Sequence, residues 1–234
     1  MARNVQLEKL LVKLRAEARI SRNPAHNTND QDRQIEILQR KQEWFWNDFD
    51  WPHLRVKRTI PIQAGQYEYA LPDDLTVDRI EQIEIRRDRE YRKLSPNISS
   101  AHYAACDTEL GERDWPPRRW QLTENEMIEV WPIPDQNAVA DTLEGNLRIT
   151  GIRGLKPLVD MSDRADLDDM LLVLHAAAEL LAERGTEDAE LKLEQATKHY
   201  HGLRAQLSPN RVVTMAGVRS SQSRPRRSTA VYNR

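Results

Sequence analysis

Acidic side chains near the start of the last third of the sequence are the first candidates for metal binding or proton transfer. Five aspartates fall within ten residues, at Asp160, Asp163, Asp166, Asp168 and Asp169. The segment lacks the turn glycine and the twelfth-position glutamate of a calcium-binding loop. It directly precedes an amphipathic segment, where negative charge stabilises the N-terminus of a helix. We therefore interpret this acidic cluster as structural.

The histidines and the single cysteine make a weak case for a metal site. His199 and His201 are two residues apart, and on a helix such side chains point about 200° away from each other. We expect both to be exposed. His102 and Cys106 could share one helix face, but a zinc site needs further ligands. The nucleotide-binding, zinc-protease and serine-hydrolase motifs are missing from the sequence. We predict no catalytic residue, metal or cofactor, and keep an enzyme using the aspartates or His102 as the weakest alternative.

The composition indicates a globular chain with a modest core. The sequence has 234 residues, of which 39% are hydrophobic and 31% charged, so most of it is expected to fold. A single cysteine allows no intrachain disulfide and fits a reducing compartment. No apolar run reaches the roughly 20 residues that cross a bilayer, and the N-terminus does not resemble a signal peptide. Membrane and secreted classes are not expected.

Charge is distributed unevenly between the body of the chain and its C-terminus. The 35 basic and 37 acidic residues give a net charge of −2. Six arginines and no acidic residue lie in 211–234, so this segment is +6 and residues 1–210 carry −8. A basic tail rich in Ser and Arg on an acidic body is typical of an interaction segment that orders on binding. A tail without a partner is the alternative.

Helical periodicity marks four segments, two near each end of the chain. Apolar residues recur every three or four positions in 5–20, 35–49, 167–181 and 189–207, which predicts amphipathic helices. Thr28 with Gln31, Ser162 or Asp163, and Thr186 are the expected caps at three of the starts. Gly185 is expected to end the third helix.

Alternation with period two predicts strands between the helix pairs. Residues 54–62 and 67–71 alternate around the turn Ala64-Gly65, which predicts a hairpin. Further strands are expected around 80–85, 91–94, 119–122, 127–131 and 146–152. The polar stretch 95–117 is too long for a tight turn and is typical of a contact loop.

These elements predict an α+β fold. We expect the N- and C-terminal helix pairs to form one antiparallel bundle, because isolated amphipathic helices cannot bury their apolar faces. The predicted units are the helix pair 1–51, a β-rich insertion 52–157, the helix pair 158–207 and an extended basic arm 208–234.

Six tryptophans stand beside only two phenylalanines. Trp44, Trp46 and Trp51 flank the first helix-to-strand junction, whereas the others lie in the β region. Tryptophan beside arginine can stack on single-stranded nucleic acid, but tryptophan is equally suited to cores and subunit interfaces. We favour the core or interface interpretation. The candidate subunit or tail contacts are Trp115, Arg118, Arg119, Trp120 and Trp131.

Several local patterns, weak singly and specific together, resemble the head-to-tail adaptor (neck or connector) proteins of tailed bacteriophages. Trp44-Phe45-Trp46 ends a helix and leads to Asp50-Trp51-Pro52-His53-Leu54. The run Thr59–Tyr69 then closes with Ala70-Leu71-Pro72-Asp73-Asp74-Leu75. Further on, Trp120-Gln121-Leu122 leads to Ile128–Asp135, which ends in the Pro-x-Pro-Asp run, and an Ala/Leu-rich helix follows. The resemblance covers about residues 5–207.

The resemblance implies a structural virion protein without catalytic activity. Such adaptors form a ring of about twelve copies beneath the portal, join the capsid to a tail tube or nozzle, and leave a channel for double-stranded DNA. It places the chain in the virion neck, after assembly in the host cytoplasm. By the same resemblance the arm 208–234 binds the portal protein. Its candidate contact residues are Val212, Val213, Met215, Val218, Arg219, Arg224, Arg226, Arg227, Tyr232 and Arg234.

The main alternative is a nucleic-acid-binding protein whose arginine-rich tail contacts phosphates. This alternative predicts strong, salt-dependent affinity of the isolated chain for DNA. The adaptor interpretation predicts little affinity for DNA, because the acidic body repels phosphates, and predicts a ring when the protein meets the portal.

Overall fold

The computed structural model describes residues 2–21, 23, 30–105 and 111–208. Within them the fold is α+β, as the sequence predicts. The helices are α1 (Leu7–Glu17), α2 (Gln31–Asp48), α3 (Ser100–Ala104), α4 (Asp169–Glu183) and α5 (Asp188–Leu207), with a 3-10 turn η2 (Pro52–Leu54). The strands are β1 (Arg55–Pro61), β2 (Glu68–Ala70), β3 (Leu75–Arg87), β4 (Glu90–Lys93), β5 (Ser95–Pro96), β6 (Arg119–Leu122), β7 (Met127–Trp131) and β8 (Asn146–Arg153).

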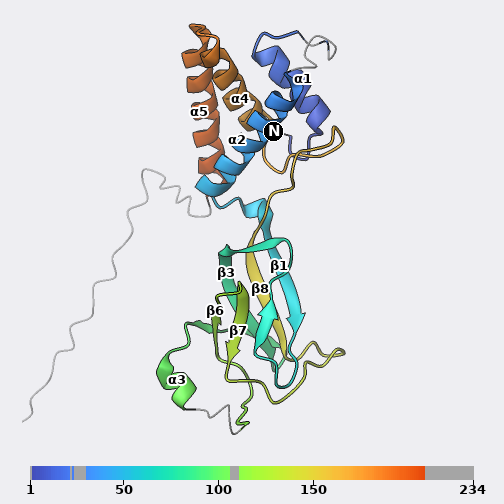
Figure 1. Cartoon of the computed structure of the whole chain (residues 1–234), viewed down its shortest axis with the longest axis vertical. Coiled ribbons are helices and arrows are strands. Elements are labelled where there is room, and N and C mark those ends of the chain that lie inside the picture. Colours follow the sequence, from blue (N-terminus) through green and yellow to red (C-terminus); the bar gives the residue numbers. More distant parts are fainter. Residues whose placement is uncertain (1, 22, 24–29, 106–110, 209–234) are drawn as a thin grey trace, which may run out of the picture.

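The molecule is elongated and has two bodies joined by a narrow waist (Figure 1). The helical body contains α1, α2, α4 and α5, and the β body contains the strands with α3. Each body has its own hydrophobic core. The chain enters the β body through β1 and leaves it through β8, and these strands are antiparallel neighbours that pair Arg55 with Ile152 at the waist.

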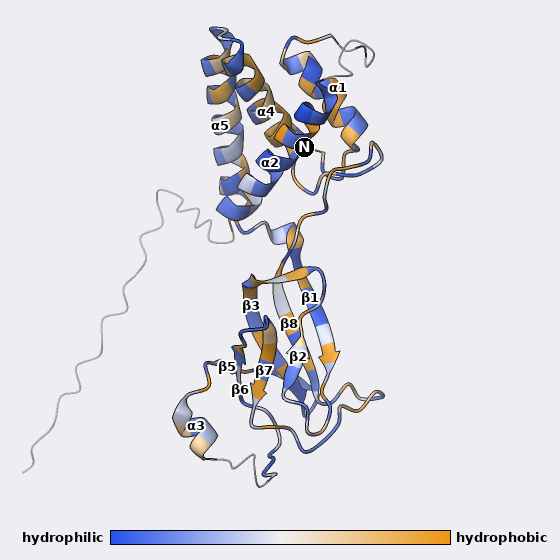
Figure 2. Cartoon of the chain, viewed as in Figure 1, coloured by the Kyte–Doolittle hydropathy of each residue, from blue (hydrophilic) through white to orange (hydrophobic). Residues whose placement is uncertain are grey.

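Helix α4 is the centre of the helical body. It packs against α1, α2 and α5, and it is buried around most of its circumference because its sequence is apolar on nearly every side. Figure 2 shows this contrast, with hydrophobic residues along α4 and a largely hydrophilic α5. Residues from the N- and C-terminal halves of the chain therefore share one core.

The structure shows that the caps expected for α4 and α5 are wrong. Asp168 caps α4 and accepts a hydrogen bond from the Leu171 backbone N–H (3.1 Å), so neither Ser162 nor Asp163 does so. Glu187, not Thr186, occupies the N-cap of α5. Asp30 holds the N-cap position of α2, while Thr28 lies outside the described residues. Gly185 follows the end of α4 with a φ of +65°, as its predicted role requires.

In the described part of the chain, the strands form two four-stranded sheets with the orders β1-β8-β3-β4 and β2-β7-β6-β5. The predicted hairpin is wrong, because β1 pairs with β8 whereas β2 pairs with β7 in the other sheet. The turn at Gly65 (φ +79°) exists, but it carries the chain between sheets. The apolar faces of the two sheets enclose the core of the β body.

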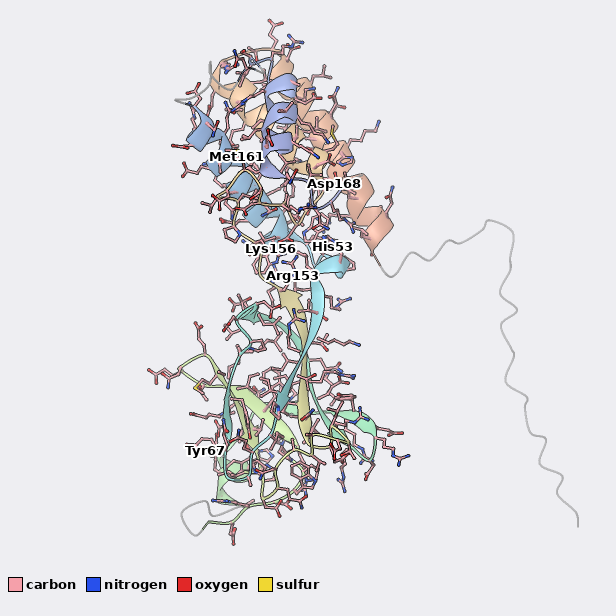
Figure 3. All side chains as sticks on the ribbon, turned by 90° about the vertical axis from the view of Figure 1, so that its right-hand side faces the viewer. His53, Tyr67, Arg153, Lys156, Met161 and Asp168 are labelled. Atoms are coloured by element: carbon pink, nitrogen blue, oxygen red, sulfur yellow. The ribbon has the colours of Figure 1, made fainter. Side chains whose placement is uncertain are left out.

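A hydrogen-bonded cluster around Asp166 connects the elements that meet at the waist. The Asp166 carboxylate forms an ion pair with Arg153 at the end of β8 and accepts a bond from the Lys156 backbone N–H (2.9 Å). Its backbone N–H donates to Gln42 of α2 (3.0 Å), and its carbonyl contacts His53 Nε2 (2.9 Å). Figure 3 shows His53, Arg153 and Lys156 together where the two bodies meet. One buried aspartate therefore connects α2, η2 and β8.

Candidate interaction site on the β body

Trp131 anchors the short helix α3 to the β body. Ser99 caps α3, and its hydroxyl lies 2.6 Å from His102 Nδ1. The Trp131 indole N–H donates to the His102 carbonyl (3.1 Å), and its ring packs edge-on against Tyr103 with the centroids 4.7 Å apart. Trp131 is buried. The predicted contact residue is thus the support of a surface helix.

A polar network lies beside this anchor. Tyr103 donates its hydroxyl proton to Glu129 Oε1 (2.7 Å), and Gln121 Nε2 donates to Glu129 Oε2 (2.7 Å). Burial raises the pKa of Tyr103, and the hydrogen bond and the negative charge of Glu129 raise it further. Tyr103 therefore stays a neutral donor, and it holds a nearly buried carboxylate in place on β7. The sequence signal was a glutamate between Ile128 and Val130 in an otherwise apolar strand.

Two adjoining pockets, of about 410 and 520 Å³, open around Trp131 and Arg113. The first also contains His102, Arg118 and Arg119, and the second contains Tyr67, Tyr103 and Glu129. Figure 3 places Tyr67 in the half of the β body that lies away from the helices. Arginines beside aromatic rings and a carboxylate suit charged and aromatic side chains of a protein partner. We call this surface the β-body site.

The other predicted contact residues lie around the β-body site in different environments. Arg118 is exposed and pairs with Asp114 (2.9 Å), and Arg119 donates to the Asn97 carbonyl (3.1 Å). Trp115 and Trp120 are half-buried and pack against the core of the β body. Stacking on nucleic acid needs a pair of rings whose faces are free. These two tryptophans therefore do not form such a pair.

The aspartates before α4 prove to be structural partners rather than a ligand set. Asp168 Oδ1 lies 2.8 Å from His199 Nε2 of α5, so His199 is half-buried and our expectation of an exposed residue is wrong. His201 is exposed. Asp169 pairs with Lys13 of α1. Burial opposes ionisation of Asp169, but the bonds from Lys13 and from the Ala2 N–H outweigh it and lower the pKa of Asp169.

Neither a metal-binding nor a membrane-spanning arrangement is found in the residues that the structure describes. No group of three or more His, Cys, Asp or Glu side chains there could hold a metal ion. No helix in the same ranges combines the length and the apolar character needed to cross a bilayer. Cys106 lies outside the described residues, as do all arm candidates from Val212 to Arg234.

The residues that the structure describes form an elongated α+β chain with a helical body and a β body. A family model described as SU10 adaptor protein matches residues 11–228. The chain therefore belongs to this adaptor family, which confirms the resemblance to phage head-to-tail adaptors. The family is a structural one and not a known enzyme family. No curated protein sequence matches the chain.

Proposed function

We propose that the chain is a structural subunit of the virion neck, which joins the phage head to the tail. The family match over residues 11–228 is the observation that carries this proposal. In this proposed role, about twelve copies of the chain form a ring beneath the portal and leave a channel for double-stranded DNA. Residues 1–210 carry −8, and an acidic ring would repel DNA phosphates and let the genome pass without specific binding.

The proposal assigns contacts to different parts of the chain. The antiparallel packing of the helix pairs 1–51 and 158–207 would make one rigid unit, with 52–157 as a second. The β-body site would meet a neighbouring copy or the tail tube or nozzle, because its arginines and aromatic rings can anchor a partner. The arm 208–234 would bind the portal, since arginine pairs well with carboxylates. Assembly would take place in the host cytoplasm.

Electron microscopy of the purified chain with and without its portal tests the proposal. We expect rings on the portal complex and only weak binding of the isolated chain to duplex DNA at about 0.15 M salt. Strong DNA binding that falls steeply with salt, without any ring, would instead support a nucleic-acid-binding protein that uses its arginine-rich tail.

A further inference from the structure

An apolar surface with a pocket lies on the helical body between α2 and α5. Its floor is formed by α4 through His175, Ala178 and Ala182, and a pocket of about 240 Å³ lies at its upper end. Leu193 of α5 forms one wall and remains 51% exposed. On the α2 side Trp44 is 54% exposed, with its ring centroid 6.4 Å from that of His175. We call this surface the helical groove.

The floor of the helical groove carries no formal charge at neutral pH. Burial lowers the pKa of His175, the nearby positive charge of Lys41 adds to this effect, and the resulting pKa is about 4. Lys41 itself pairs with Glu179 (2.6 Å). An exposed tryptophan and an exposed leucine that flank a neutral floor are typical of a docking surface for an apolar segment.

The chain leaves the helical body beside the ends of the two helices that flank this surface. The C-terminal end of α5 lies beside the C-terminal end of α2 (Figure 1), where Arg204 and Tyr200 both bond to Asp48. The segment after Leu207 therefore starts between the two helices that form the groove walls. Its sequence has an apolar run, 212–218, between Arg211 and Arg219.

The length of this segment fits the groove. From Tyr200 to Ala189 the wall of α5 is about 17 Å long at about 1.5 Å per residue. The seven residues 212–218 reach about 23 Å when extended, at about 3.3 Å each. The four residues 208–211 allow the chain to turn back from Leu207. A run antiparallel to α5 would bring Arg219 to Glu190, an exposed carboxylate at the upper end.

From these observations we propose that residues 212–218 dock in the helical groove of their own chain. Val212, Val213, Met215 and Val218 would cover Trp44 and Leu193, and Arg219 would pair with Glu190. The inference does not depend on the adaptor role, because the docking takes place within one isolated chain. It adds a second use for the arm, which would be held on the helical body before any partner meets it.

Limited trypsin digestion of the full-length chain tests this docking. In the wild type we expect cleavage after Arg211 and Arg219 to be at least tenfold slower than after Arg227, which lies beyond the docked run. Leu193→Asp should abolish this difference, because a carboxylate would enter the apolar groove. Val213→Asp should have the same effect from the other side of the contact. The circular dichroism spectrum should stay unchanged in both variants, because Leu193 lies outside the hydrophobic core of the helical body.

Leu191→Asp is the matched control, because Leu191 is 56% exposed on the same helix and does not line the groove. It should leave the cleavage pattern unchanged. Equal cleavage after Arg219 and Arg227 in the wild type would overturn the proposal, as would an effect of Leu191→Asp equal to that of Leu193→Asp. If the protection of Arg211 and Arg219 from trypsin disappears when the protein is diluted tenfold, the groove binds the arm of a second copy instead.

Discussion

The ion pair between Arg153 and Asp166 is the residue-scale feature on which the waist depends. The Asp166 side chain is 1% exposed, so its charge is compensated inside the protein. Arg153→Met should therefore cost about 3–5 kcal/mol, because it leaves a buried carboxylate without its cation. Chemical denaturation followed by tryptophan fluorescence measures this cost. Arg55→Met, which breaks an exposed pair with Glu81, should cost less than about 1 kcal/mol; equal losses would contradict the argument.

His175 gives the helical body a defined dependence on pH. The unfolded chain takes up a proton at this residue near pH 6.5, whereas the folded chain does so only near pH 4. The free energy of unfolding should therefore fall as the pH drops from about 6.5 to about 4, since protons favour the unfolded state over this window. The substitution His175→Gln should make Tm less dependent on pH there. His201→Gln, at an exposed position, should not change the slope.

At the scale of elements, Gly151 shows why β8 needs a residue without a side chain. A Cβ at Gly151 would lie 2.6 Å from the backbone oxygen of Arg79 in β3, beside the register shift at Ile80. Gly151→Ala should destabilise the β body by about 1–3 kcal/mol, because backbone atoms must move. Thermal unfolding measures the loss. Alanine at Gly202, where a Cβ would meet no heavy atom within 4 Å, is the control and should stabilise α5 or leave it unchanged.

Elements with strong local periodicity were predictable, whereas their partners were not. The stripe of α1 follows from Leu7, Leu10 and Leu14, all of which are buried. Alternation along 54–71 predicted two strands correctly but not their pairing, because alternation fixes which face is buried and carries no information on distant partners such as β8. The apolar periodicity over 189–207 includes Leu193, but the structure leaves this residue exposed. The sequence of α5 carries no information on how far the other helices already bury α4, and therefore on whether Leu193 is needed there.

The candidate site was predictable in part for similar reasons. Trp131, Arg118 and Arg119 stood out by residue type and do lie around the β-body site. Tyr103 and Glu129 were missed, since they are 26 residues apart and meet only when α3 folds back on β7. Pairings of this kind depend on tertiary contacts, which leave no local pattern in the sequence.

At the scale of the whole molecule, the arm is predicted to be dispensable for the folding of both bodies. A chain ending at Leu207 should keep its circular dichroism spectrum, because both hydrophobic cores lie within residues 5–207. It should no longer attach to the portal, since the arginines proposed to meet portal carboxylates are removed. Co-sedimentation with the portal measures attachment. Unchanged attachment of the shortened chain would show that the arm is not the anchor.

The way in which the chain crosses the waist also has a mechanical consequence. The two chain segments that cross the waist are attached to the same end of one strand pair, since β1 begins and β8 ends at the waist. Tension between the bodies therefore pulls β1 and β8 in the same direction and does not slide one past the other. Tilting the β body would disturb the contacts of Asp166 and the bonds from Arg79 to Asp50 and Trp46, while both sheets stay intact. In a ring of such subunits, each copy could adjust the angle between its two ends without unfolding either one.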